Sequence, residues 1–151
     1  MKLYLTCTDY DRQIYDILNQ DLILFAGCDE IMDLFFLDAW EDNLNINGAT
    51  VYFIVKCEPS NTDANAKINK SYASSTFPNP GAGEAAITLL ADWTKNLLGN
   101  YIYQILIKFQ NDIPMKVAAE GIVTFKKRIL TTPSGSTPYP YPPYEPDTSN
   151  M

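Results

Sequence analysis

Short apolar segments separated by turn residues run through this chain and restrict the folds open to it. The intervening stretches are rich in Gly, Pro, Asn and Asp, as in "EDNLNING" and "FPNPGAG". A doubly wound α/β fold requires helices of ten or more residues between its strands, and the sequence shows no helical pattern of that length between the segments. The sequence therefore predicts an all-β, immunoglobulin-like sandwich of about seven antiparallel strands. These strands are expected at 21–25, 31–40, 49–55, 66–73, 84–90, 101–109 and 116–125.

The 151 residues are long enough for one domain with extensions. We expect an N-terminal arm at 1–20, either helical or extended, and the sandwich at 21–130. A C-terminal tail is predicted at 131–151, because six of the ten prolines lie from Pro133 onwards. Proline at this density prevents ladder hydrogen bonds and favours an extended polyproline II chain.

Alternation within the segments predicts which side chains enter the core. Val51, Phe53 and Val55 share one face, and the pattern of the segment 84–90 points Ala85, Ile87 and Leu89 inward. In the segment 31–40 the even positions are the more apolar, which places Met32, Leu34, Phe36 and Trp40 in phase with the core.

The stretch "LLGNYIY" indicates a corner between the two sheets. In immunoglobulin-like sandwiches a tyrosine near the start of the penultimate strand hydrogen-bonds back to the corner that precedes it. Here that tyrosine is Tyr101, and Gly99 is expected to adopt the positive φ that ends a helical turn at 91–98. The alternative is an ordinary strand start with two core tyrosines, Tyr101 and Tyr103.

Four motifs give the chain a likeness to a known family. They are "GATVYFIVK" (Gly48–Lys56), "GEAAITLLADWT" (Gly83–Thr94), "LLGNYIYQI" (Leu97–Ile105) and "EGIVTF" (Glu120–Phe125). Together they resemble the N-terminal immunoglobulin-like domain of bacteriophage baseplate upper proteins and related tail-fibre attachment proteins. The resemblance covers about residues 21–130. It implies a small β-sandwich that anchors a receptor-binding fibre to the phage tail. The expected location is the virion, after synthesis in the host cytoplasm.

The residue types argue against catalysis. The chain has no histidine, which removes the usual general base near neutral pH and the Ser-His and Cys-His dyads. No phosphate-binding glycine motif is present. Two carboxylate pairs, Asp29 with Glu30 and Glu41 with Asp42, lack the spacing of a calcium loop and are expected to be solvated turn acids. We therefore expect no enzyme, no catalytic residues, no cofactor and no metal.

Three cysteines, Cys7, Cys28 and Cys57, are too few and too widely spaced for a disulfide framework or a zinc site. The first interpretation is that they are small buried hydrophobes. A single internal bridge or a bridge between molecules is the alternative.

The charge of the chain limits the kinds of partner it can bind. The net charge is −7, which argues against nucleic acid. The sequence contains no run of 18 uncharged apolar residues, so no membrane span is expected, and the N-terminus lacks the apolar core of a signal peptide. Acidic residues gather in the first 63 positions. They can face basic residues of another copy or be neutralised within one fold.

The tail carries "YPYPPYEP", which predicts an extended segment that contacts a neighbouring protein. Its expected contact residues are Tyr139, Tyr141, Pro142, Pro143 and Tyr144, with disorder as the alternative. With the resemblance, the expected function is structural: a tail, baseplate or fibre-attachment adaptor that binds other virion proteins and forms homo-oligomers or arrays. A capsid decoration protein is the alternative. A receptor- or carbohydrate-binding module that uses Trp40 or Trp93 is the alternative from another class.

Overall fold

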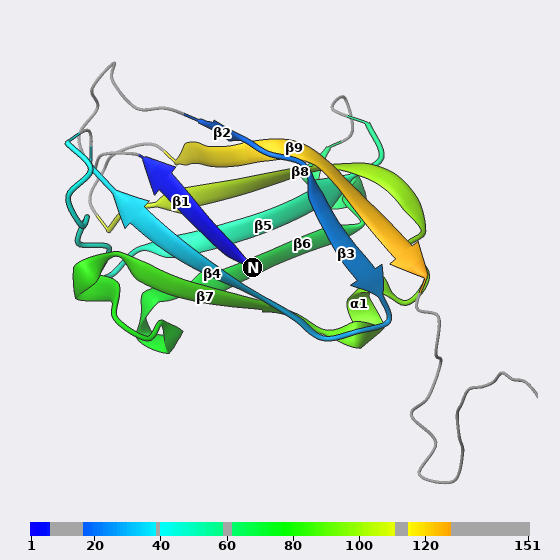
Figure 1. Ribbon diagram of the computed structural model, residues 1–151, viewed down its shortest axis with the longest axis horizontal. Coiled ribbons are helices and arrows are strands. Elements are labelled where there is room, and N and C mark those ends of the chain that lie inside the picture. Colours follow the sequence, from blue (N-terminus) through cyan, green and yellow to red (C-terminus); the bar gives the residue numbers. More distant parts are fainter. Residues whose placement is uncertain (7–16, 39, 59–61, 111–114, 128–151) are drawn as a thin grey trace, which may run out of the picture.

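A computed structural model describes residues 1–6, 17–38, 40–58, 62–110 and 115–127 (Figure 1). These residues form two β-sheets whose buried faces share one hydrophobic core. The predicted all-β sandwich is confirmed. The residues predicted as the C-terminal tail, 131–151, lie entirely outside the described part of the chain, so the tail stays a prediction.

The small sheet has three strands in the order β1-β4-β7. They are β1 (Lys2–Thr6), β4 (Glu30–Leu37) and β7 (Glu84–Leu89). The large sheet has six strands in the order β2-β9-β8-β5-β6, with β3 also paired to β9. Its strands are β2 (Leu18–Asn19), β3 (Leu22–Ala26), β5 (Thr50–Lys56), β6 (Ile68–Ala73), β8 (Gly99–Lys108) and β9 (Lys116–Lys127).

Short helical turns join the strands at the ends of the sandwich. Three are 3-10 turns, at Asp63–Asn65, Ser74–Thr76 and Pro80–Ala82, and the fourth is the single α-helical turn α1 (Ala91–Thr94). The predicted helical turn before the strand that begins at Gly99 is therefore present. No helix in the described residues is long and apolar enough to cross a membrane.

The N-terminal region differs from the prediction in two respects. The described parts of the segment expected as an arm are strands: β1 belongs to the small sheet and β2 to the large one. In addition, β1 pairs parallel with β4, and β2 and β3 pair parallel with β9, so the purely antiparallel prediction is wrong for these pairs. A parallel partner is distant in sequence, and the apolar pattern of a strand does not indicate its direction.

The core follows the predicted alternation closely. Met32, Leu34 and Phe36 of β4 are fully buried, as are the inward residues predicted on β5 and β7. The edges of the two sheets are also linked, because the hydroxyl of Tyr72 on β6 donates to the carbonyl oxygen of Thr88 on β7 at 2.7 Å. Burial raises the pKa of Tyr72 to about 12.

Candidate interaction surfaces

The corner before β8 has the geometry that its glycine indicates. Gly99 has a φ of +99°, and a Cβ added there would meet no atom within 4 Å, so conformation rather than space selects glycine. Tyr101 packs its ring edge-on against Phe125, with 5.8 Å between ring centroids. The predicted site pair Gly99 and Tyr101 thus lies at the mouth of β8.

The tyrosine hydroxyl that reaches back across the fold belongs to Tyr103. It is fully buried and donates to the carbonyl oxygen of Gln20 at 2.5 Å, which ties β8 to the chain just before β3. Burial, with the nearby carboxylates of Asp21 and Glu120, raises the pKa of Tyr103 to about 12.

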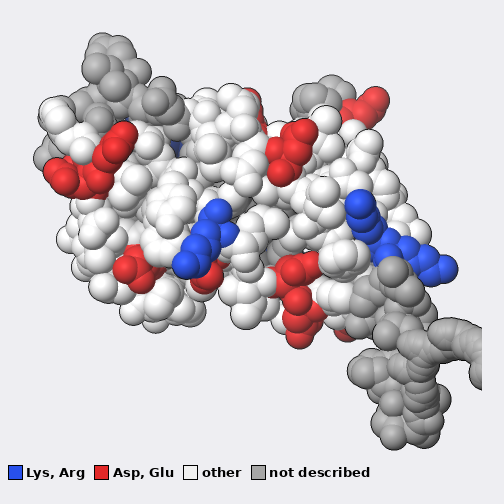
Figure 2. Space-filling view, in the orientation of Figure 1, with Lys and Arg blue, Asp and Glu red and all other residues white. Residues whose placement is uncertain are grey.

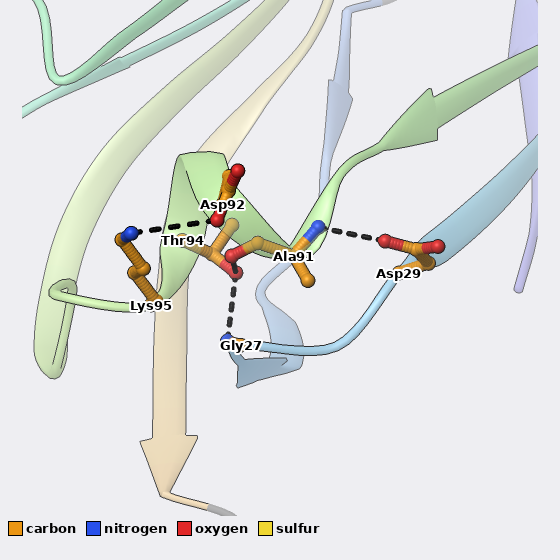
Figure 3. A network of polar contacts seen from close by, with 6 residues as sticks. All are labelled: Gly27, Asp29, Ala91, Asp92, Thr94 and Lys95. Carbon is orange, nitrogen blue, oxygen red and sulfur yellow. Dashed lines mark hydrogen bonds and ion pairs between the residues drawn. The ribbon is translucent and has the colours of Figure 1, made fainter.

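The helical turn α1 is fastened to the loop after β3 by two hydrogen bonds (Figure 3). The Asp29 carboxylate accepts from the backbone N–H of Ala91 at 2.7 Å, and the hydroxyl of buried Thr94 accepts from the N–H of Gly27 at 2.9 Å. On the surface, Lys95 pairs with Asp92 at 3.4 Å. Asp29 thus satisfies the start of α1 from a distant segment, a role that its sequence position does not indicate.

Two of the four carboxylates expected in turns, those of Asp29 and Glu30, accept hydrogen bonds from backbone N–H groups in the part of the chain described. Glu30 accepts from the backbone N–H of Phe25 at 3.0 Å, beside the role of Asp29 at α1. Glu41 adopts a φ of +65°, unusual for a residue other than glycine. Among the described residues, no group of three or more His, Cys, Asp or Glu side chains is placed to hold a metal ion.

Trp40 corrects the sequence-based prediction most clearly. It is 71% exposed, so its assignment to the core is wrong. The strand β4 ends at Leu37, and Asp38 then begins a turn in which its carboxylate accepts from the N–H groups of Trp40 at 2.8 Å and Asp42 at 3.0 Å. An aspartate that starts a turn in this way was the sequence signal for the end of the strand.

Trp93 lies in α1 and is partly buried against the core, as predicted. The ammonium group of Lys70, on β6, sits over its ring at 4.4 Å from the centroid. This cation–π contact holds the side chain over the edge of the large sheet. Trp40 is exposed and Trp93 is partly buried, so the two tryptophans do not form one platform for stacking a sugar.

The described cysteines differ from the first interpretation. Cys28 is half-buried and Cys57 is exposed, and both are free thiols. The expectation of a small buried hydrophobe is wrong for Cys57. Cys7 lies outside the described residues, as do the predicted contact residues Tyr139, Tyr141, Pro142, Pro143 and Tyr144.

The outward side of the small sheet carries an aromatic pair. Tyr4 on β1 and Phe35 on β4 are register partners and stack with 5.0 Å between ring centroids and 19° between planes. Tyr4 is 57% exposed, and so is Ile31 on the same side of β4. In Figure 2 most of the visible surface is white, and charged side chains appear singly or in small groups.

The outward side of the large sheet also exposes apolar side chains. Ile23 and Ile122 are exposed, and the register sets Ile102 on β8 directly opposite Ile122 on β9. Two adjoining hollows, of about 340 Å³ and about 80 Å³, open on this side and share Ile102 and Gln104 in their walls. Exposed apolar side chains thus follow strands on both sheets.

Comparisons with known proteins find no match in sequence and a structural similarity at low identity. No known protein family and no curated protein matches the sequence. Among solved structures, the chain is similar to the N-terminal domain of phage TP901-1 ORF48, with a TM-score of 0.45 and 10% identity. The similarity covers 83% of this chain and 98% of that one. At this level it assigns no function to the chain.

Proposed function

We propose that this chain is a structural component of a bacteriophage virion, a tail, baseplate or fibre-attachment adaptor that acts by protein–protein contacts rather than by catalysis. The observation that carries the binding role is the set of exposed apolar residues on both outward sheet sides. The virion setting is supported by the motif resemblance. Its partners are other virion structural proteins and further copies of the chain.

The side chains on those surfaces suit an assembly protein. Tyr4 and Phe35 form a stacked aromatic pair on neighbouring strands, and Ile31 lies further along the same side of β4, beyond Asp33, so that binding a partner orders few rotors. Ile23 and Ile122 provide a second patch on the other sheet. A protein with two such sides can contact two neighbours at once, as an adaptor must.

Quantitative mass spectrometry of purified particles tests this proposal. We expect the chain to co-purify with tail proteins in a small copy number that matches the tail symmetry. Hundreds of copies per particle support the alternative of a capsid decoration protein. Absence from washed particles contradicts a virion role.

Matched variants test the surfaces. Ile31→Lys or Ile23→Lys is expected to lower incorporation into particles, because a charge then lies within an apolar contact. Asn96→Lys adds the same charge at an exposed polar position and is the control. Equal incorporation of all three contradicts the apolar sides as contact surfaces.

The exposure of Trp40 favours a second candidate, a receptor- or carbohydrate-binding module. An indole that is open to solvent on a hydrogen-bonded turn can stack on a sugar ring. Glycan-array binding by the full chain that is lost in Trp40→Ala supports this candidate. Binding that Trp40→Ala leaves unchanged removes Trp40 as the sugar contact.

A further inference from the structure

The two hollows on the outward side of the large sheet adjoin each other and are together called the groove. The smaller is lined by Ile54, Lys56, Ile102, Tyr103 and Gln104. The larger is lined by Asn19, Ile102, Gln104, Glu120, Gly121 and Ile122. Because both share Ile102 and Gln104, the groove crosses β5, β8 and β9.

The groove combines an apolar floor with polar walls. Ile102 and Ile122 face each other across the β8–β9 pair. Beside them the Gln104 amide donates to one carboxylate oxygen of Glu120 at 3.2 Å. This arrangement suits a side chain with a flat apolar body and a hydroxyl at its tip, because the ring can cover the isoleucines while the hydroxyl donates to the carboxylate.

One wall of the groove depends on a close backbone approach. The Ile122 N–H donates to the Asp21 carboxylate at 3.1 Å, and a Cβ added at Gly121 would lie 2.5 Å from the carbonyl oxygen of Gln20. The chain between β2 and β3 therefore passes directly beside β9. The absence of a side chain at Gly121 allows this close approach.

The chain contains a segment with the chemistry that this groove suits. Residues 139–144 read "YPYPPY", with three tyrosines separated by prolines. Such a segment favours the extended polyproline II form, so ordering it costs less conformational entropy than ordering a flexible peptide.

The position of the segment in the chain lets it reach the groove. Ile122 lies five residues before Lys127, the last residue of β9, which corresponds to about 17 Å along the strand. Eleven residues separate Lys127 from Tyr139, enough to span up to about 36 Å when extended. A tether of this length gives an effective concentration on the order of millimolar, so a groove on the same molecule is favoured over one on a neighbour in dilute solution.

We propose that this groove binds the Tyr139–Tyr144 segment of its own chain. The tyrosine rings lie on Ile102 and Ile122, and a tyrosine hydroxyl donates to Glu120. In the isolated protein the tail then covers the apolar groove. The proposal does not depend on a virion role, and it is tested on the isolated full chain.

The test is methyl NMR of the full chain with labelled isoleucines. Ring-to-methyl cross-peaks are expected between the tail tyrosines and the δ1-methyl groups of Ile102 and Ile122. Replacing all three tail tyrosines by serine is expected to remove these cross-peaks and to shift both methyl signals. Tyr4→Ser, which removes an exposed tyrosine from the opposite sheet, should leave both signals in place.

A second variant tests the groove from the other side. Ile122→Glu should abolish the cross-peaks at Ile102 without unfolding the protein, because Ile122 is exposed. Ile31→Glu, the same change on the small sheet, should retain them. Methyl signals that the triple tyrosine variant leaves unchanged overturn the proposal. Cross-peaks that weaken on tenfold dilution also overturn it, because they then come from a neighbouring copy.

Discussion

The two tryptophans of the chain lie in turns that are held in different ways. Trp93 sits in α1, which is bonded to residues more than 60 positions away through Asp29 and Thr94 (Figure 3). Trp40 sits in a turn whose hydrogen bonds, among the described residues, run between residues 38 and 42. The long-range bonds make the α1 corner part of the sandwich. The local bonds fix the shape of the other turn while leaving its indole in solvent.

This difference separates residues that stabilise the fold from residues available for recognition. Trp93 contacts the core and Lys70, so changing it alters packing. Trp40 is 71% exposed, so a change there removes a contact surface and little else. Matched variants in the two regions should therefore change the free energy of unfolding by different amounts.

Trp93→Ala should give the largest effect. Trp93 is partly buried against the core, so its replacement by alanine should cost about 3 kcal/mol, the lower end of the range for core aromatic residues, with the lost cation–π contact with Lys70 included. We expect the free energy of unfolding in urea to fall by about 3 kcal/mol. A loss below about 0.5 kcal/mol, typical of surface substitutions, would show that α1 is not part of the cooperative unit.

Alkaline pH tests a second long-range bond of the same kind, between Tyr103 and Gln20. The pKa of Tyr103 is about 12 in the folded protein and 10.0 in the unfolded chain. Above pH 10 the unfolded state therefore loses this proton first, and stability falls as the pH rises towards 12. Two pKa units correspond to about 2.7 kcal/mol as an upper limit.

The measurement is the free energy of unfolding at pH 9 and at pH 11.5. Tyr103→Phe removes the titrating hydroxyl, so its stability should fall less over this interval than that of the unchanged protein. Part of the fall remains in this variant, because the pKa of Tyr72 is also raised to about 12. Identical pH profiles for the two proteins contradict the assignment.

Thr94→Val isolates one of the bonds that fasten α1. The substitution keeps the size of the side chain but removes the hydroxyl that accepts from Gly27. We expect a loss of about 1–2 kcal/mol in the free energy of unfolding, since Thr94 is fully buried and the Gly27 N–H loses its partner. Asn96→Ala, an exposed change in the same corner, is the control.

Most of the fold could be predicted from the sequence because strand alternation records burial directly. The inward residues of β4, β5 and β7 follow from their period of two. A glycine at position 99, after a helical turn, predicts the positive φ observed there. The parallel pairing of β1 with β4 could not be predicted, because it depends on which distant segment covers an edge. Trp40 was misplaced because the alternation was extended past Leu37, where Asp38 already begins the turn.

The candidate surfaces were harder to predict than the core. Ile102 and Ile122 are ordinary strand residues in the sequence, and they become part of a groove only when the register places them opposite each other beside Gly121. Asp29 looks like a solvated turn acid until the fold brings it to Ala91. Both depend on contacts between segments far apart in the chain, about which local patterns carry no information.

Trp40→Ala should give the smallest change in stability and completes the comparison. Because the indole is exposed and the Asp38 carboxylate bonds to backbone N–H groups, alanine leaves the turn intact. We expect the free energy of unfolding to change by less than about 0.5 kcal/mol. If Trp40 serves in recognition, Trp40→Ala should nevertheless lower binding to its partner, measured by particle incorporation or glycan binding. A large loss of stability would instead place Trp40 with Trp93, as a residue that holds the sandwich together.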